Sequence, residues 1–110
     1  MRIALVQQRA GGDPAENLER GRLAFLEAAR AGADLVAFAE LAFTRFYPQK
    51  PAAADSLALA ETIPGPTTDL FRDLARRTGT AAVLNLFERD GDRTFDSSPV
   101  IDADGRLLGV

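Results

Sequence analysis

The sequence predicts an α/β fold in which parallel strands alternate with amphipathic helices and are followed by β-hairpins. Short apolar runs typical of buried strands lie at residues 3–6 and 35–39, with one helical pattern between them. After Gly79, the apolar stretches are separated by short turns that contain Asp and Gly, which is the pattern of hairpins. We therefore expect one α/β domain over residues 1–110.

The first unit is predicted to be strand, helix, strand. After the strand at residues 3–6, Asp13 and Pro14 are typical of a helix start, with Asp as the capping side chain and Pro at the first helical position. Apolar residues then repeat at helical spacing until Gly32, a residue type that commonly ends helices. The strand at residues 35–39 follows, so we expect it to pair in parallel with the first strand.

A second amphipathic helix and three strands are predicted for the rest of the chain. Either Thr67 or Thr68 is expected to cap this helix, and Gly79 to end it. The strands are predicted over residues 82–87, 94–101 and 106–110.

Composition excludes several functional classes. The net charge is -3, and acidic and basic residues are interspersed, so the chain lacks the basic surface that nucleic acids or anionic membranes need. No segment has the length of an export signal or a membrane span, which favours a cytoplasmic location. The sequence contains no cysteine, which excludes disulfides and thiolate metal sites within it.

Glu40 is the main candidate for a functional residue. It directly follows the apolar run at residues 35–39, and open α/β folds place their chemistry at the carboxyl edge of the sheet. The structural alternative is a carboxylate that caps the next helical turn. Phe46 and Tyr47 are more typical of core or loop anchors than of binding residues, but they follow closely enough to form the wall of a pocket beside Glu40. Lys50, the only lysine, is interpreted as a solvated surface residue.

Asn85 is a second polar residue in an unusual context, because it interrupts the apolar run at residues 83–87. If it is buried, its amide needs hydrogen-bond partners or a ligand. We favour a satisfied structural amide and leave open that it lines a pocket.

Five stretches of the sequence carry a joint signal: residues 12–18 (GDPAENL), 32–36 (GADLV) running on to Glu40 and Leu41, 63–68 (IPGPTT), 87–91 (FERDG) and 101–109 (IDADGRLLG). Taken together and in this order, they resemble the N-terminal part of the nitrilase superfamily of carbon–nitrogen hydrolases. Among members of that superfamily, the sequence looks most similar to the N-carbamoylputrescine amidase and β-ureidopropionase group.

The resemblance implies a four-layer α-β-β-α sandwich, of which this chain would supply the N-terminal part. It also implies a Glu-Lys-Cys triad that cleaves amide or N-carbamoyl bonds of small molecules, with no metal or organic cofactor and with homo-oligomeric assembly when complete. Glu40 matches the base of that triad, and the lysine and cysteine would lie beyond Val110. One departure is Ala39, where family members usually carry proline.

From this resemblance we expect the chain to be a truncated hydrolase that is inactive alone. Burial and the missing lysine are expected to raise the pKa of Glu40. The alternative is a non-catalytic homologue that binds a small ligand or acts as a regulatory subunit.

Overall fold

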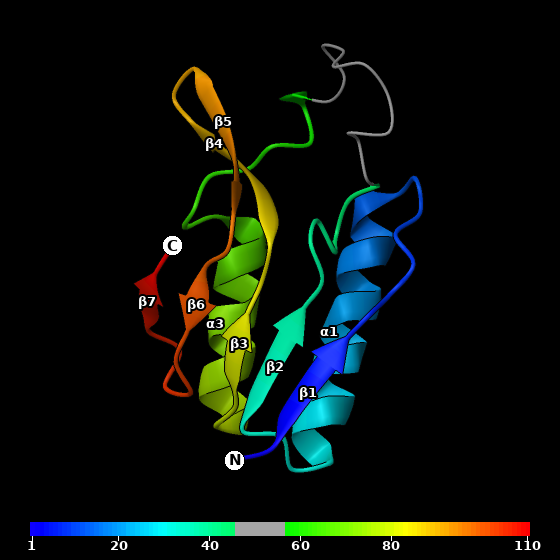
Figure 1. Cartoon of the computed structure of the whole chain (residues 1–110), viewed down its shortest axis with the longest axis vertical. Helices are drawn as coiled ribbons and strands as arrows, with labels where there is room; N and C mark the ends of the chain where they lie inside the picture. Colours follow the sequence, from blue (N-terminus) through cyan, green and yellow to red (C-terminus); the bar gives the residue numbers. More distant parts are fainter. Residues whose placement is uncertain (46–56) are drawn as a thin grey trace.

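The computed structural model describes residues 1–45 and 57–110 of the chain (Figure 1). Within these ranges, no helix is long and apolar enough to cross a bilayer. The helices and strands are, in chain order, β1 (Ile3–Val6), α1 (Pro14–Arg30), β2 (Leu35–Phe38), α3 (Pro66–Thr78), β3 (Ala81–Val83), β4 (Leu86–Asp90), β5 (Arg93–Ser97), β6 (Val100–Ile101) and β7 (Leu107–Gly109).

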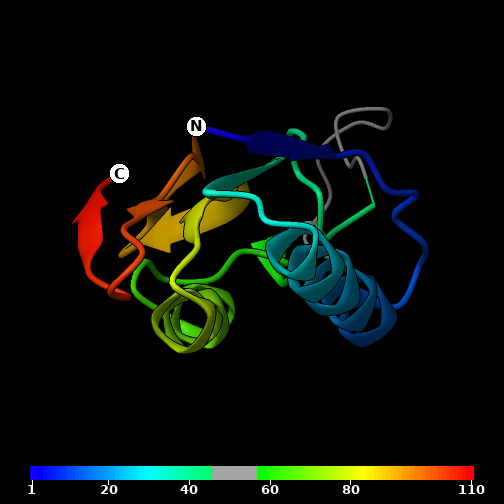
Figure 2. The ribbon, with the colours of Figure 1, turned by 90° about the horizontal axis from the view of Figure 1, so that it is seen from below.

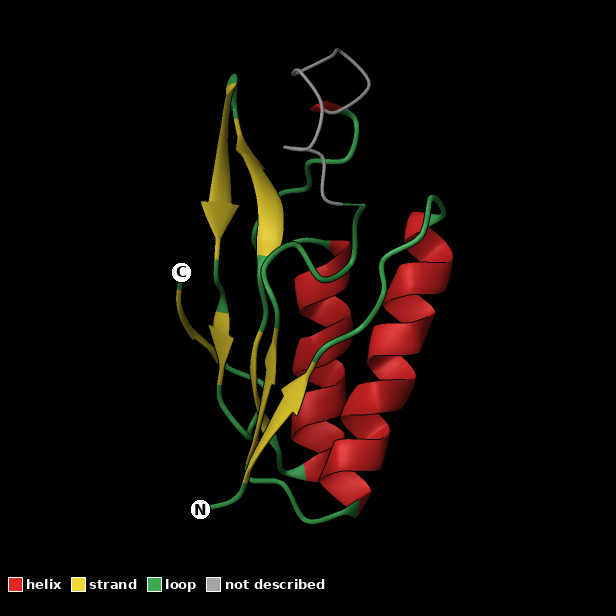
Figure 3. Ribbon diagram, turned by 45° about the vertical axis from the view of Figure 1, so that its right-hand side comes forward, coloured by secondary structure: helices red, strands yellow, loops and turns green. Residues whose placement is uncertain are grey.

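The main sheet has five strands in the order β1-β2-β3-β6-β7. The strands β1, β2 and β3 are parallel, because α1 and α3 carry the chain back between them, whereas β6 and β7 join in antiparallel pairing. Both helices lie on the same face of the sheet (Figures 2 and 3). The predicted α/β fold, with strand, helix, strand, a second helix and hairpins, is confirmed.

Both helices begin and end at residues that suit these positions. The side chain of Asp13 accepts a hydrogen bond of 2.8 Å from the backbone of Ala15 and so caps α1, as predicted. For α3 the predicted cap was wrong, since Gly65 is the capping residue and Pro66 starts the helix. The Thr68 hydroxyl instead accepts a hydrogen bond of 2.7 Å from the backbone N–H of Gly65. Proline at the first helical position costs nothing, because that N–H has no partner within the helix.

The core between helices and sheet is centred on Phe71 of α3. This ring is fully buried and lies 5.7 Å from Phe25, 5.2 Å from Phe38 and 5.3 Å from Phe43, measured between ring centroids. The four rings come from α1, β2, the turn after β2, and α3, so one aromatic cluster joins all of these segments.

The predicted strands at residues 82–87 and 94–101 are each broken in two. Their first and last parts, β3 and β6, belong to the main sheet, whereas β4 and β5 pair with each other as a separate hairpin. The breaks fall at residues 84–85 and 98–99, which include a proline without an N–H for sheet pairing. The hairpin consequently extends past the carboxyl ends of β1 and β2 (Figure 1).

The edge strand β1 leaves apolar side chains in solvent. Ile3 is 54% exposed and Leu5 is 83% exposed, whereas Ala4 and Val6, which alternate with them, pack against the core. The period of two residues along the strand places the first pair on the sheet face opposite the helices.

Candidate active site

Glu40 lies two residues beyond the end of β2, at the carboxyl edge of the sheet, as predicted. The next residue, Leu41, has a φ of 48°, a left-handed backbone conformation that residues other than glycine rarely adopt. This conformation costs on the order of 1–2 kcal/mol and must be stabilised by its surroundings. Two contacts supply that stabilisation: the Leu41 side chain is buried with Phe87 and Ala60, and its N–H donates a hydrogen bond of 2.6 Å to Asn85 Oδ1.

The amide of Asn85 connects this turn to the β4–β5 hairpin. While Oδ1 accepts from Leu41, Nδ2 donates to Asp96 Oδ1 at 2.7 Å and to Ser98 Oγ at 3.0 Å. These partners fix the orientation of the amide, since only the oxygen can accept from a backbone N–H. The preferred sequence interpretation, a satisfied structural amide, is confirmed, although the residue is half-buried and does not line the cavity described below.

Asp96 on β5 is the principal electrostatic neighbour of Glu40. The Asp96 carboxyl raises the pKa of Glu40, first by a hydrogen bond between the two side chains, then, after a contribution from burial, by charge repulsion. The predicted direction was correct, but burial is not the main cause, because Glu40 is an exposed residue. Glu40 and Asp96 thus form a carboxyl pair.

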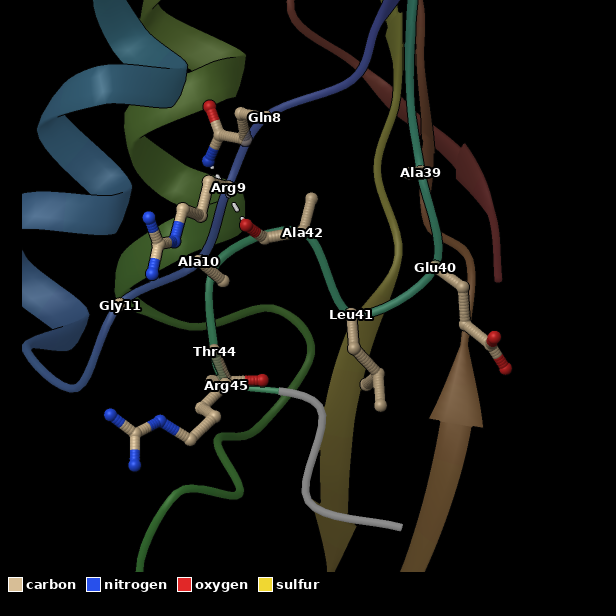
Figure 4. A pocket seen from close by; sticks show the side chains of 10 residues that line it. All are labelled: Gln8, Arg9, Ala10, Gly11, Ala39, Glu40, Leu41, Ala42, Thr44 and Arg45. Atoms are coloured by element: carbon tan, nitrogen blue, oxygen red, sulfur yellow. Dashed lines mark hydrogen bonds between the residues drawn. The ribbon is translucent and has the colours of Figure 1, made fainter. Parts of the chain in front are cut away.

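A cavity of about 640 Å³ lies beside Glu40. Figure 4 shows that the Glu40 carboxylate lies at one side of the cavity and is turned away from the guanidinium groups of Arg9 and Arg45. Neither arginine is among the groups that shift the pKa of Glu40. The lining residues are Gln8, Arg9, Ala10, Gly11, Ala39, Glu40, Leu41, Ala42, Thr44 and Arg45.

Two amides hold the wall of this cavity in place. Gln8 Nε2 donates to the backbone oxygens of Asn17 and Ala42, both at 3.0 Å. Asn17, which is 1% exposed, donates to the oxygens of Gly11 and Phe43 at 3.0 and 3.2 Å and accepts from the Gly11 N–H at 2.7 Å. The loop after β1, the start of α1 and the turn after β2 are thus linked by directional bonds.

Among the candidate residues that the sequence suggested, the structure describes Glu40 and Asn85. Phe46, Tyr47 and Lys50 lie outside the described residues. Sequence reasoning missed Asp96, whose position between Phe95 and two serines carries no local signal of its pairing with Glu40. Across the described ranges, no cluster of His, Cys, Asp and Glu suits a metal ion.

Comparison with known families and proteins gives a consistent result. Residues 2–110 match the family model described as carbon-nitrogen hydrolase. The chain is 32% identical to the citrullinase of Francisella tularensis subsp. tularensis over 111 residues, a match that covers all of this chain and 38% of that protein. The chain therefore spans well under half the length of this curated relative.

Two solved structures resemble the chain over nearly its whole length. A carbon-nitrogen hydrolase from Helicobacter pylori G27 matches with a TM-score of 0.86 at 21% identity, covering 97% of this chain and 37% of that one. An amidase from Nesterenkonia sp. AN1 matches with a TM-score of 0.75 at 26% identity, covering 99% and 41%. The latter structure is a double mutant, with glutamate changed to glutamine and cysteine to alanine, in complex with acrylamide.

Proposed function

Because this chain belongs to the carbon-nitrogen hydrolase family, we propose that it is the N-terminal part of an amidase-type enzyme in which Glu40 is the general base. The observation that carries the proposal is the position of Glu40, an acid at the carboxyl end of a parallel strand beside a cavity of about 640 Å³. Active sites of open α/β folds form at this edge.

The proposed reaction needs two further groups. Glu40 would take the proton of a cysteine thiol, the thiolate would attack the carbonyl carbon, and the amine would leave with the same proton. Water, activated by Glu40, would then hydrolyse the acyl-enzyme, while a lysine stabilises the oxyanion in both steps. The sequence has no cysteine, and its one lysine is Lys50, so we propose that both groups come from residues that follow Val110 in the complete enzyme.

The substrate class we propose is a small linear amide or N-carbamoyl compound. Two relatives support it by their names: a citrullinase, since citrulline ends in a carbamoyl group, and an amidase captured with acrylamide, a small primary amide. Hydrolysis of either kind of substrate would release ammonia, and a carbamoyl group would also release carbon dioxide. A finer assignment to N-carbamoylputrescine or β-ureido acids remains our proposal from the sequence motifs.

The lack of cysteine favours a second candidate function. A chain without the nucleophile could bind a small amide in the cavity beside Glu40 without cleaving it, as a ligand-binding or regulatory homologue. The two candidates differ in one measurable property, which is the catalytic turnover of the protein extended beyond Val110.

Ammonia release from N-carbamoyl amino acids, citrulline and acrylamide tests the proposal. The 110-residue chain alone is expected to show no turnover, because loss of the nucleophile costs about a million-fold in related covalent mechanisms. In a protein extended to include the lysine and cysteine, Glu40→Gln should lower kcat by about 10²- to 10⁴-fold, the usual contribution of a general base.

The matched control is Glu27→Gln in the extended protein, since Glu27 is an exposed carboxylate of α1 away from the cavity. It should leave kcat unchanged. Turnover by the chain alone that disappears in Glu40→Gln would contradict the proposed division of the triad. An extended protein that binds these amides without cleaving them would favour the non-catalytic candidate.

A further inference from the structure

Asn85 occupies the gap where the chain leaves the main sheet for the β4–β5 hairpin. Ser98 lies in the matching gap where the chain returns, between β5 and β6. The amide Nδ2 of Asn85 donates to Ser98 Oγ at 3.0 Å. This hydrogen bond joins the segment between β3 and β4 to the segment between β5 and β6. The same amide also reaches out of the hairpin, to the turn that carries Glu40.

The bond to that turn acts on the peptide group that joins Glu40 to Leu41. The Leu41 N–H belongs to this peptide group, and Asn85 Oδ1 accepts from it at 2.6 Å. Since the orientation of the peptide and the left-handed φ of 48° at Leu41 are coupled, holding the N–H holds the turn. The direction in which Glu40 leaves the backbone therefore depends on the side chain of Asn85.

The bond to the hairpin acts on the carboxyl partner of Glu40. Asn85 Nδ2 donates to one oxygen of Asp96 at 2.7 Å, and the Asp96 carboxyl also interacts with Glu40. A single amide thus holds the backbone beside one carboxyl group and the side chain of the other. Other charged groups near this pair are Arg9 and Arg45, which line the far side of the cavity, and Glu88, which bonds to Ser97.

We propose that Asn85 and Asp96 are positioning residues for Glu40: Asn85 fixes the peptide that precedes Leu41, and Asp96 receives a hydrogen bond from Glu40 when Glu40 is protonated. The catalytic meaning of this arrangement rests on the proposed function. When Glu40 takes the thiol proton, the protonated Glu40 carboxyl donates a hydrogen bond to the Asp96 carboxylate until the amine leaves with that proton. No bond to Asp96 breaks or forms beyond that hydrogen bond, and the negative charge of Asp96 makes Glu40 a stronger base.

The test is a carboxyl-carbon NMR titration of the 110-residue chain, which needs no substrate and no turnover. The wild-type Glu40 midpoint should lie above the ordinary value for glutamate, and Asp96→Asn should move it down toward that value. Asp92→Asn removes one charge from the turn of the same hairpin and is the matched control, so the Glu40 midpoint should not move. An unchanged midpoint in Asp96→Asn would overturn the role of Asp96.

The role of Asn85 is tested with two variants and a second readout. A left-handed residue gives a strong NOE between its own N–H and Hα, because these protons are close at positive φ. Asn85→Ala should weaken this NOE at Leu41 and lower the Glu40 midpoint. Asn85→Asp keeps the acceptor for the Leu41 N–H, so the NOE should persist while the added carboxylate raises the Glu40 midpoint further.

Retention of the Leu41 NOE and of the Glu40 midpoint in Asn85→Ala would overturn the positioning role. Both readouts are independent of the proposed triad. A chain whose extended form lacks hydrolase activity could still show the carboxyl pair, and an active enzyme could lack it, so the two proposals fail separately.

Discussion

The core under α1 and α3 and the carboxyl edge of β2 are stabilised by different kinds of interaction. Around Phe71, four aromatic rings pack with centroid distances of 5.1–5.7 Å, and the stabilisation comes from buried apolar area. At the edge, the turn after β2 is held by the amides of Gln8, Asn17 and Asn85, each of which makes at least two hydrogen bonds. Apolar packing tolerates substitutions that conserve side-chain volume, whereas hydrogen bonds depend on atom type.

Of the two regions, the edge is the one that can form a functional site. The edge carries Glu40, the cavity and the carboxyl pair, and all three depend on directional bonds between segments that are distant in the sequence. The core supplies a rigid base for these segments but offers no polar group to a substrate, because its cluster is made of apolar side chains.

The largest effect on stability is expected from Phe71→Ala. Removal of a fully buried ring that contacts three others should lower the free energy of unfolding by about 3–5 kcal/mol. Leu74→Met is the control on the same helix, because it nearly conserves volume and should cost less than about 1.5 kcal/mol. Urea denaturation followed by circular dichroism measures the free energy of unfolding of both variants. Equal losses of stability would mean that the core, like the edge, does not tolerate a change that conserves volume.

A smaller effect, about 1–3 kcal/mol, is expected from Asn17→Asp at the edge. The change conserves size but removes the donors to Gly11 and Phe43 and places a carboxylate where the residue is 1% exposed. The same denaturation experiment provides the measurement. If Asn17→Asp were neutral while Leu74→Met was costly, the contrast between the two regions would be reversed.

The smallest effect is the pH dependence of stability that the carboxyl pair adds. The pKa of Glu40 is raised in the folded chain, chiefly by the hydrogen bond with Asp96, so the folded state binds this proton more tightly than the unfolded state. The contribution is present below the ordinary pKa of glutamate and is lost as pH rises through the raised value. Denaturation of wild type and Asp96→Asn over a pH series should show the wild-type advantage shrinking as pH rises through this window.

Asp73 provides the opposite sign within the same molecule. Hydrogen bonds from Arg76 and then Arg77 lower the pKa of Asp73, so its contribution is present above the ordinary pKa of aspartate and is lost as pH falls. Asp73→Asn should therefore reduce stability at neutral pH but not at strongly acidic pH. If the stability advantage of the wild type over Asp73→Asn grew toward acidic pH, the ion pairs of Asp73 would not determine the sign of the pH dependence.

The sequence predicted the parts of the fold that local patterns determine. Apolar periodicity and the residues Asp13 and Gly32 place β1, α1 and β2 correctly, and Glu40 falls at the predicted edge. The breaks at residues 84–85 and 98–99 were missed, because these stretches read as continuous strands, although Pro99 lies in the second break and Asn85 forms tertiary hydrogen bonds at the first. Asp96 was missed because its position in the sequence carries no local signal of its pairing with Glu40.

The exposed side chains of β1 have a practical consequence for anyone who handles this protein. Among the described strands, β1 is an outer one, with one backbone edge unpaired, and it carries Leu5 almost fully in water. An unpaired edge strand with exposed apolar side chains favours self-association as samples are concentrated. Strand β1 is therefore expected to affect turbidity and storage lifetime more than melting temperature.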